Sequence, residues 1–225
     1  MNKCPAIEAL CLCKRYGTLT VFAGLGLSVG EGETVVVMGS NGAGKTTLLR
    51  CLSGSVRPTS GRVLWFGRMS AKDPEVRRSI GVVGHESYLY PNLTALENLR
   101  FAARMSDLFD PESCLARMLD DSGLRSCANR LTRELSRGLR QRVSLLRALV
   151  HEPRILLWDE PFAGLDSQAV DWLLELLRAQ RLAGRTICLA LHDAQLACRL
   201  ADRIVVLKHG RLGESDLALN HGRVA

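Results

Sequence analysis

The chain has 225 residues, of which 47% are hydrophobic and 24% are charged. This composition is ordinary for a globular protein and excludes an intrinsically disordered chain. Thirty Lys and Arg against 23 Asp and Glu give a net charge of +7, which suits a phosphate ligand, an anionic membrane surface or a nucleic acid without choosing among them.

The N-terminal part of the sequence predicts neither a targeting segment nor a membrane span. Charges at Lys3, Glu8, Lys14 and Arg15 interrupt it, so it holds no apolar signal-peptide core. The longest uncharged stretch, 16–30, is glycine-rich and too short to cross a bilayer. Eight cysteines are too few for a secreted disulfide scaffold. We therefore expect a cytosolic chain with reduced thiols, and a partner must supply any membrane part.

Strand-like and helix-like segments alternate along the chain. Residues 1–32 and 61–70 are expected to form short antiparallel strands and turns. Continuous apolar runs predict strands buried on both faces, as in a parallel sheet; they occupy 34–38, 154–158, 186–191 and 203–207. Helical patterns dominate 92–150, and an amphipathic helix is expected over 167–182. The alternation indicates an α/β fold, a single nucleotide-binding unit with a helical insertion.

A glycine-rich loop follows the first of these buried strands. It fits the phosphate-loop pattern, with a strand before it and a helical segment after it. Backbone N–H groups of such a loop point into one concavity, and the start of the helix adds positive potential for phosphate. Lys45 is placed for the β- and γ-phosphates, and the Thr46 hydroxyl for Mg²⁺. The predicted nucleotide-binding residues here are Gly39, Ser40, Asn41, Gly42, Ala43, Gly44, Lys45, Thr46 and Thr47.

Two acidic residues end the apolar strand 154–158. Asp159, at the carboxyl end of a strand, can hold the Mg²⁺ shell, and Glu160 can polarise a water for attack on the γ-phosphate. Taken alone, the pair also fits an exposed strand end. Together with the phosphate loop it predicts Mg²⁺-dependent ATP hydrolysis, with ATP and Mg²⁺ as the cofactors.

Further motifs, in their order along the chain, resemble those of ABC-transporter ATPases. Residues 135–142 resemble the signature motif, 163–166 the D-loop, and His192 the switch histidine that follows a strand. Tyr16 is similar to the aromatic residue that stacks on adenine. The resemblance covers nearly the whole chain. It implies an α/β P-loop NTPase fold of the ABC type, with a RecA-like core, an antiparallel β subdomain and a helical insertion.

The resemblance also implies a site divided between two chains. Ser136, where a helix is expected to begin, and Gly138 in its first turn would clamp the γ-phosphate bound by the opposite subunit. Asp166 of the D-loop would join them at the nucleotide. His192 would act with Glu160 and Lys45 in catalysis. A homodimer of ATPase subunits around two Mg·ATP molecules, coupled to separate transmembrane permease subunits, is therefore expected.

The organisation and location of the chain follow from the same resemblance. One ABC ATPase domain is expected over 1–225, with the core and β subdomain in 1–85 and 151–225 and the helical subdomain in 86–150. The chain would lie peripherally on the cytoplasmic side of the bacterial inner membrane. The expected permease contact is 87–91, because tyrosine and apolar side chains suit such a joint. The alternative is that these side chains pack within their own subdomain.

Some positions depart from the family's pattern. Arg137 and Leu139 replace the usual glycine and glutamine of the signature, so only Ser136 and Gly138 are carried over. His85 stands where the family has a glutamine that touches Mg²⁺ and the attacking water. We expect His85 to contribute to the metal shell, with Glu86 as the neighbouring candidate. The alternative is that His85 is an ordinary loop residue.

Several segments look like the ATP-binding subunit of the haem exporter used in c-type cytochrome maturation. They are 39–50, 63–65, 84–85, 93–101 and 159–164. This similarity predicts a part in cytochrome c biogenesis. The alternatives are an ATPase subunit of another small-molecule exporter and a soluble ABC ATPase that does not transport.

Rival classes differ from a transporter subunit in features that the sequence can address. A soluble ABC ATPase of translation or DNA repair usually carries two cassettes or a long coiled-coil insertion, and these 225 residues show neither. A regulatory nucleotide-binding module with feeble turnover is disfavoured by Glu160 and His192, although His85 and Leu139 leave it open. The arginine-rich segment 125–147 lacks interleaved stacking aromatics, so no nucleic-acid partner is expected.

Overall fold

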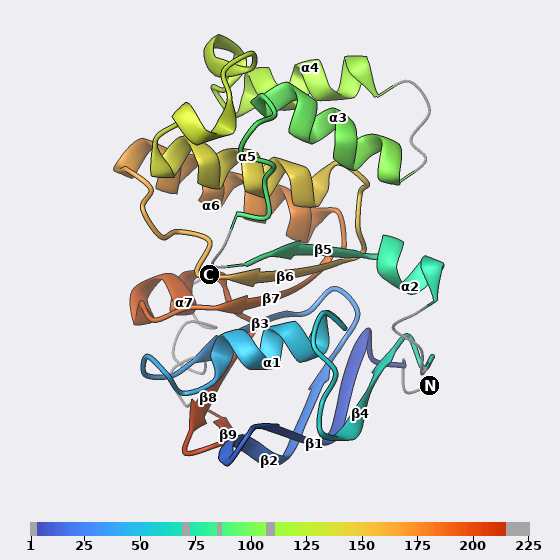
Figure 1. Cartoon of the computed structure of the whole chain (residues 1–225). Coiled ribbons are helices and arrows are strands. Elements are labelled where there is room, and N and C mark those ends of the chain that lie inside the picture. The colour runs from blue at the N-terminus through green and yellow to red at the C-terminus, as the bar shows by residue number, and fades with distance from the viewer. Residues whose placement is uncertain (1–3, 69–72, 85–86, 107–110, 215–225) are drawn as a thin grey trace.

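The computed structural model describes residues 4–68, 73–84, 87–106 and 111–214. Within these ranges the strands form two sheets (Figure 1). The antiparallel sheet has the order β2-β1-β4, built from β1 (Ile7–Tyr16), β2 (Leu19–Val29) and β4 (Ser60–Trp65). The second sheet has the order β5-β6-β7-β3-β8-β9. Its strands are β5 (Ile80–Val83), β6 (Ile155–Asp159), β7 (Thr186–Ala190), β3 (Thr34–Met38), β8 (Arg203–Lys208) and β9 (Arg211–Glu214).

The strands of the second sheet pair in parallel from β5 to β8, and β9 is antiparallel to β8. On β3, Val36 packs into one apolar cluster, and Val35 and Val37 pack into another. This alternation follows from the period of two along a strand. Fully burying such a side chain stabilises the fold by roughly 1.5–3 kcal/mol. The parallel sheet predicted from uninterrupted apolar runs is therefore confirmed.

Helices cover both faces of the parallel sheet (Figure 1). One face is covered by α5 (Arg137–Leu149), α6 (Ser167–Leu182) and α7 (Ala194–Leu200). The other face is covered by α1 (Lys45–Leu52), which also packs against the antiparallel sheet. Trp65 of β4 donates its Nε1–H to the Leu52 carbonyl of α1 at 2.7 Å. The expected α/β core with an antiparallel β subdomain is confirmed.

A helical part lies beyond α5 and α6 (Figure 1). It contains α3 (Ala95–Met105), α4 (Glu112–Asp121) and the 3₁₀ turns Arg125–Cys127 and Thr132–Glu134, whereas the short α2 (Pro74–Arg78) precedes β5. Helix α3 begins with a capping box: Thr94 Oγ1 accepts from the Glu97 N–H at 3.2 Å, and Glu97 Oε2 accepts from the Thr94 N–H at 2.7 Å.

Helix α5 joins the helical part to the sheet. Val143 and Leu146 belong to the apolar cluster of α3 and α4, whereas Leu145 and Ala148 belong to the cluster on the parallel sheet. The subdomain boundary expected at residue 150 falls just after this shared helix, and the division into subdomains stays a prediction. No helix among the described residues has both the length and the apolar character needed to span a bilayer.

Candidate functional site

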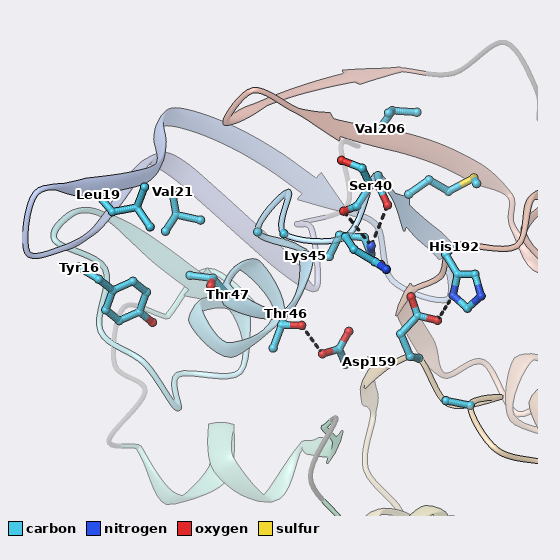
Figure 2. Close-up of a pocket in the computed structure, with 17 residues that line it drawn as sticks. Tyr16, Leu19, Val21, Ser40, Lys45, Thr46, Thr47, Asp159, His192 and Val206 are labelled. Atoms are coloured by element: carbon cyan, nitrogen blue, oxygen red, sulfur yellow. Dashed lines mark hydrogen bonds and ion pairs between the residues drawn. The ribbon is translucent and has the colours of Figure 1, made fainter.

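A cavity of about 1080 Å³ opens at the carboxyl ends of β3 and β6. In α/β sheets this edge is where ligands bind. The predicted site residues that line it are Tyr16, Gly39, Ser40, Asn41, Gly42, Gly44, Lys45, Thr46, Thr47, Asp159, Glu160 and His192. In Figure 2 the Tyr16 side chain lies at one end of this cavity, His192 lies at the other, and Thr46 and Asp159 lie between them. The fold thus gathers these residues from four separate segments of the chain.

The loop 39–44 takes a shape that requires glycine. Gly44 is the N-cap of α1 with a left-handed φ of 105°, and a Cβ on it would lie 2.6 Å from Val21 Cγ1. A side chain here would therefore be strained in its backbone and would clash. Ala43 does not line the cavity; its methyl group packs against the core cluster beneath α1. The loop brings the start of α1, with its unpaired N–H groups, to the cavity.

Lys45 is a largely buried cation on the first turn of α1. Lys45 is only 7% exposed. Its Nζ donates to the carbonyl oxygens of Gly39 at 2.7 Å and Ser40 at 3.3 Å. These bonds compensate for the loss of solvation that a buried ammonium group suffers. They also hold the positive charge at the mouth of the loop.

Thr46 and Asp159 form a pair with the chemistry of a cation site. Thr46 Oγ1 donates to Asp159 Oδ2 at 2.6 Å (Figure 2). Asp159 is 4% exposed, and its Oδ1 is buried without a hydrogen-bond partner among the described residues. A buried carboxylate oxygen without a partner is costly unless a proton donor or a cation satisfies it. The two residues therefore fit the predicted Mg²⁺.

The protein alone supplies few ligands for that ion. Among the described residues, no group of three or more His, Cys, Asp and Glu side chains could hold a metal. Mg²⁺ is commonly bound through one or two protein groups together with water and substrate phosphates. The arrangement therefore suits an ion that arrives with a phosphate ligand. His85 and Glu86 lie outside the described residues, so the role expected for His85 stays a prediction.

Glu160 and His192 meet at the end of the cavity. His192 Nδ1 lies 2.7 Å from Glu160 Oε2, and their side chains are 69% and 20% exposed. The Glu160 backbone has a φ of +48°, a strained conformation for a residue with a side chain. Its N–H donates to the Ala190 carbonyl at 3.0 Å, at the end of β7. The sequence predicts both residues for the site, but not this backbone conformation.

The opposite end of the cavity has an apolar wall that sequence reasoning missed. Tyr16 pairs with Leu19 across the β1–β2 hairpin, and Leu19 and Val21 line the cavity beside it (Figure 2). Lys14 Nζ lies 4.7 Å from the centroid of the Tyr16 ring. Met38, Ala163 and Val206 complete the lining. Gly17 indicates a turn, and a hairpin placed there is the one sequence feature from which Leu19 could have been predicted.

The predicted signature and D-loop site residues Ser136, Gly138 and Asp166 do not line this cavity. Ser136 caps α5, accepting from the Leu139 N–H at 3.3 Å. A Cβ on Gly138 would lie 3.1 Å from the Gly164 carbonyl oxygen. Asp166 caps α6, accepting from the Ala169 N–H at 2.8 Å. Within one chain, Ser136 and Asp166 cap helices and Gly138 lies in the first turn of α5. None of the three lines the ligand cavity.

Comparisons with known proteins point to one family. The family model described as ABC transporter matches residues 22–163. The chain is 35% identical over 211 residues to the spermidine/putrescine import ATP-binding protein PotA of Spiroplasma citri, covering 92% of this chain and 60% of that protein. It thus spans less than two thirds of that relative. It is 33% identical over 216 residues to the glutamine transport ATP-binding protein GlnQ of Escherichia coli, covering 92% of this chain and 90% of that protein.

Solved structures give the same result. The dimeric, post-hydrolysis structure of the ATP-binding cassette MJ0796 bound to ADP and Pi aligns with a TM-score of 0.83 and 29% identity, covering 94% of this chain and 98% of that one. The structure of cbiO1 from Clostridium perfringens, described as part of the ABC transporter complex cbiONQ, aligns with a TM-score of 0.77 and 28% identity. That alignment covers 95% of this chain and 89% of that one.

Proposed function

We propose that this chain, which belongs to the ABC transporter family, is the ATP-binding and ATP-hydrolysing subunit of a membrane transporter. The single observation that carries this proposal is the row of groups along one cavity, from the Tyr16 ring through Lys45 and the Thr46–Asp159 pair to Glu160 and His192. A nucleotide has matching parts in the same order: an aromatic base, phosphates with their metal ion, and the terminal phosphate that is attacked.

The roles proposed for the binding residues follow from their chemistry. The Tyr16 ring stacks on adenine, and Leu19 and Val21 cover its apolar surroundings. N–H groups of the loop 39–44 and the start of α1 bind the phosphates. Lys45 leaves its backbone carbonyl partners to bind the β- and γ-phosphates as a point charge.

Thr46 and Asp159 are proposed to hold Mg²⁺, because Asp159 has a buried carboxylate oxygen that lacks a hydrogen-bond partner in the part of the chain that the structure describes. When bound, the ion neutralises charge on the phosphate oxygens. Glu160, which lines the cavity and has a left-handed backbone, is the proposed general base. His192, 2.7 Å away, orients the Glu160 carboxylate.

A second copy of the chain is proposed to complete the site. Ser136, Gly138 and Asp166 stay outside the cavity of their own chain, although the first two lie at a helix start that suits an anion. A head-to-tail homodimer places them against the γ-phosphate held by the partner. The dimeric structure of MJ0796 supports such an arrangement.

The permease contact is proposed at an exposed apolar cluster of the helical part. Its members are Tyr88, Tyr90, Phe101 and Met105, which are 42%, 51%, 42% and 69% exposed. Tyr90 and Phe101 stack edge to face with their centroids 4.9 Å apart. Exposed aromatic groups in one patch are typical of protein interfaces. Through this contact the chain would lie peripherally on the cytoplasmic face of the bacterial inner membrane.

Two transport directions are candidates. The relatives named above carry import or transport names, which supports an importer subunit. The segments 84–85 and 93–101, with the other segments that resemble the haem exporter ATPase, support export in cytochrome c biogenesis. The permease decides between them, because the substrate path lies in that subunit. No nucleic-acid partner is part of either proposal.

The test is phosphate release from ATP by the purified chain, with and without Mg²⁺, followed by affinity purification of the tagged chain from membranes. Mg²⁺-dependent release and co-purification of a polytopic membrane protein are expected. The identity of that protein distinguishes importer from haem exporter. A folded chain that neither binds ATP nor releases phosphate contradicts the ATPase proposal, and absence of any membrane protein contradicts the transporter proposal.

A further inference from the structure

Side chains of α5 and of the residues just after it are bonded to the main chain of β5 and of Ser87. Ser144 Oγ donates to the Ser87 carbonyl at 2.8 Å, and Arg147 Nη2 donates to the Val82 carbonyl at 3.4 Å. His151, just past the helix, has its Nε2 3.2 Å from the Ile80 carbonyl. Ser144 and Arg147, three residues apart, lie on one face of the helix. Strand β5 is the edge strand of the parallel sheet (Figure 1).

Arg147 is an unusual member of this face. Its Nε is buried and has no hydrogen-bond partner among the described residues. Burial also lowers the pKa of its guanidinium from the ordinary value. A charged side chain in such a place destabilises the fold relative to an apolar side chain of similar size. Packing alone therefore does not account for an arginine here.

The partner of Arg147 is an aromatic ring held in a strained segment. Arg147 Cζ lies 5.8 Å from the centroid of the Tyr88 ring, within the range of a cation–π interaction. Tyr88 has a left-handed φ of +50°. Its ring also covers Gly84, because a Cβ on Gly84 would lie 2.6 Å from Tyr88 Cε2. The ring thus lies against Gly84 and within reach of the Arg147 guanidinium.

Gly84 and Ser87 face the acidic residues of the site. They line a second cavity of about 330 Å³ whose other walls include Gln141, Asp159 and Glu160. Two residues fixed by α5 and Tyr88 therefore border the carboxylates proposed for metal binding and general-base catalysis.

We propose that Arg147 is a positioning residue for ATP hydrolysis, which acts through the Tyr88 ring and the Val82 carbonyl to hold Gly84 and Ser87 against the Asp159–Glu160 cavity. This inference rests on the roles proposed above for Asp159 and Glu160. Arg147 itself touches neither the nucleotide cavity nor these carboxylates. Its effect is on the geometry in which hydrolysis takes place and not on nucleotide binding.

The test compares Arg147→Met, Tyr88→Leu and the double variant in steady-state ATP hydrolysis and thermal unfolding. Arg147→Met is expected to lower kcat by roughly tenfold, since small displacements at a reacting centre have effects of this order or larger. The KM for ATP and the Tm should stay near the wild-type values, or the Tm should rise. Tyr88→Leu should have the same effect, and the double variant should be no worse than either single variant. Arg147→Lys should recover part of kcat.

A matched control and an independent variant sharpen the test. Arg154→Met removes another arginine–aromatic contact, 4.1 Å from the centroid of Phe66 and away from the site, and it should leave kcat unchanged. Gly84→Ala displaces the Tyr88 ring without altering Arg147, so it should lower kcat in the wild-type chain and have little further effect in Tyr88→Leu. If Arg147→Met does not fold, Gly84→Ala provides the test instead.

A wild-type kcat in folded Arg147→Met, or additive losses in the double variant, overturns the positioning role. A fall in Tm that accounts for the lost activity does the same. Glu160→Gln, measured alongside, separates this inference from the proposed function. If Glu160→Gln retains normal turnover, the assignment of the site fails. If Glu160→Gln is inactive and Arg147→Met is normal, only the role of Arg147 fails.

Discussion

The Thr46 hydroxyl donates a 2.6 Å hydrogen bond to Oδ2 of Asp159, a residue 113 positions further along the chain. The bond joins the first turn of α1 to the end of β6, and it forms because β3 and β6 run parallel with β7 between them. Parallel strands bring their carboxyl ends to the same edge of the sheet. The pair thereby leaves Asp159 Oδ1, which is buried and has no hydrogen-bond partner within the described ranges, available to a cation.

Lys45→Ala should weaken ATP binding by roughly 10- to 100-fold, since hydrogen bonds to a charged group contribute about 1.5–3 kcal/mol. Binding of a fluorescent ATP analogue, followed by titration, measures the change. Arg104→Ala removes an exposed cation of α3 and should bind as the wild type does. Unchanged affinity in folded Lys45→Ala contradicts the phosphate-binding role.

Glu160→Gln should bind ATP normally and hydrolyse it roughly 10²-fold more slowly or worse, the usual effect of losing a general base. Single-turnover phosphate release separates this from an effect on binding. Glu175→Gln on α6, whose side chain is 70% exposed, is the matched control. Normal turnover in Glu160→Gln removes Glu160 from the catalytic role.

The divided site predicts a nucleotide-trapped dimer. Glu160→Gln with Mg·ATP should double its mass in size-exclusion chromatography with light scattering, because the slow variant keeps ATP between two chains. Adding Ser136→Ala should abolish the dimer, whereas Ser55→Ala, at an exposed serine, should not. Loss of the α5 cap costs about 1 kcal/mol, so the Tm of Ser136→Ala must be measured too. A strictly monomeric ATP complex contradicts the shared site.

Two exposed aromatic residues should anchor the chain to its permease: Phe101 on α3, and Tyr90 in the segment before that helix. Tyr90→Ala combined with Phe101→Ala removes the edge-to-face contact and two of the four side chains of the patch, and should shift the protein from the membrane fraction to the supernatant in sedimentation. ATP binding should not change. Leu182→Ala, at a leucine 90% exposed on α6, should leave membrane association intact. Retained association in the double variant places the contact elsewhere.

The cysteines should differ sharply in reactivity. Burial raises the pKa of the Cys188 thiol to about 12, so it stays protonated at any pH below that value, and only thiolates react. Cys4 and Cys11 are exposed. Alkylation of the native protein at about pH 8, read by mass spectrometry, should modify these two and leave Cys188 intact until unfolding. Equal native rates at Cys188 and Cys11 contradict this packing.

The strand, the glycine-rich loop and the helix within 34–52 could be predicted from the sequence, because each is specified by local chemistry. The run of buried residues in β3 and the glycine at the left-handed N-cap of α1 leave few alternatives for that segment. The capping box at Thr94 and Glu97 is equally local. Asp159 and Glu160 were found because an apolar strand directly precedes them.

Only the tertiary structure decided which distant groups meet. Leu19 and Val21 enter the nucleotide cavity through the register of a hairpin, and a shift of one residue would turn them away. The left-handed backbone of Glu160 and its 2.7 Å contact with His192 depend on β6 and β7 being neighbours. The Arg147–Tyr88 contact depends on how α5 lies across β5. Periodicity and capping act over a few residues, whereas these contacts are fixed by packing between segments far apart in the sequence.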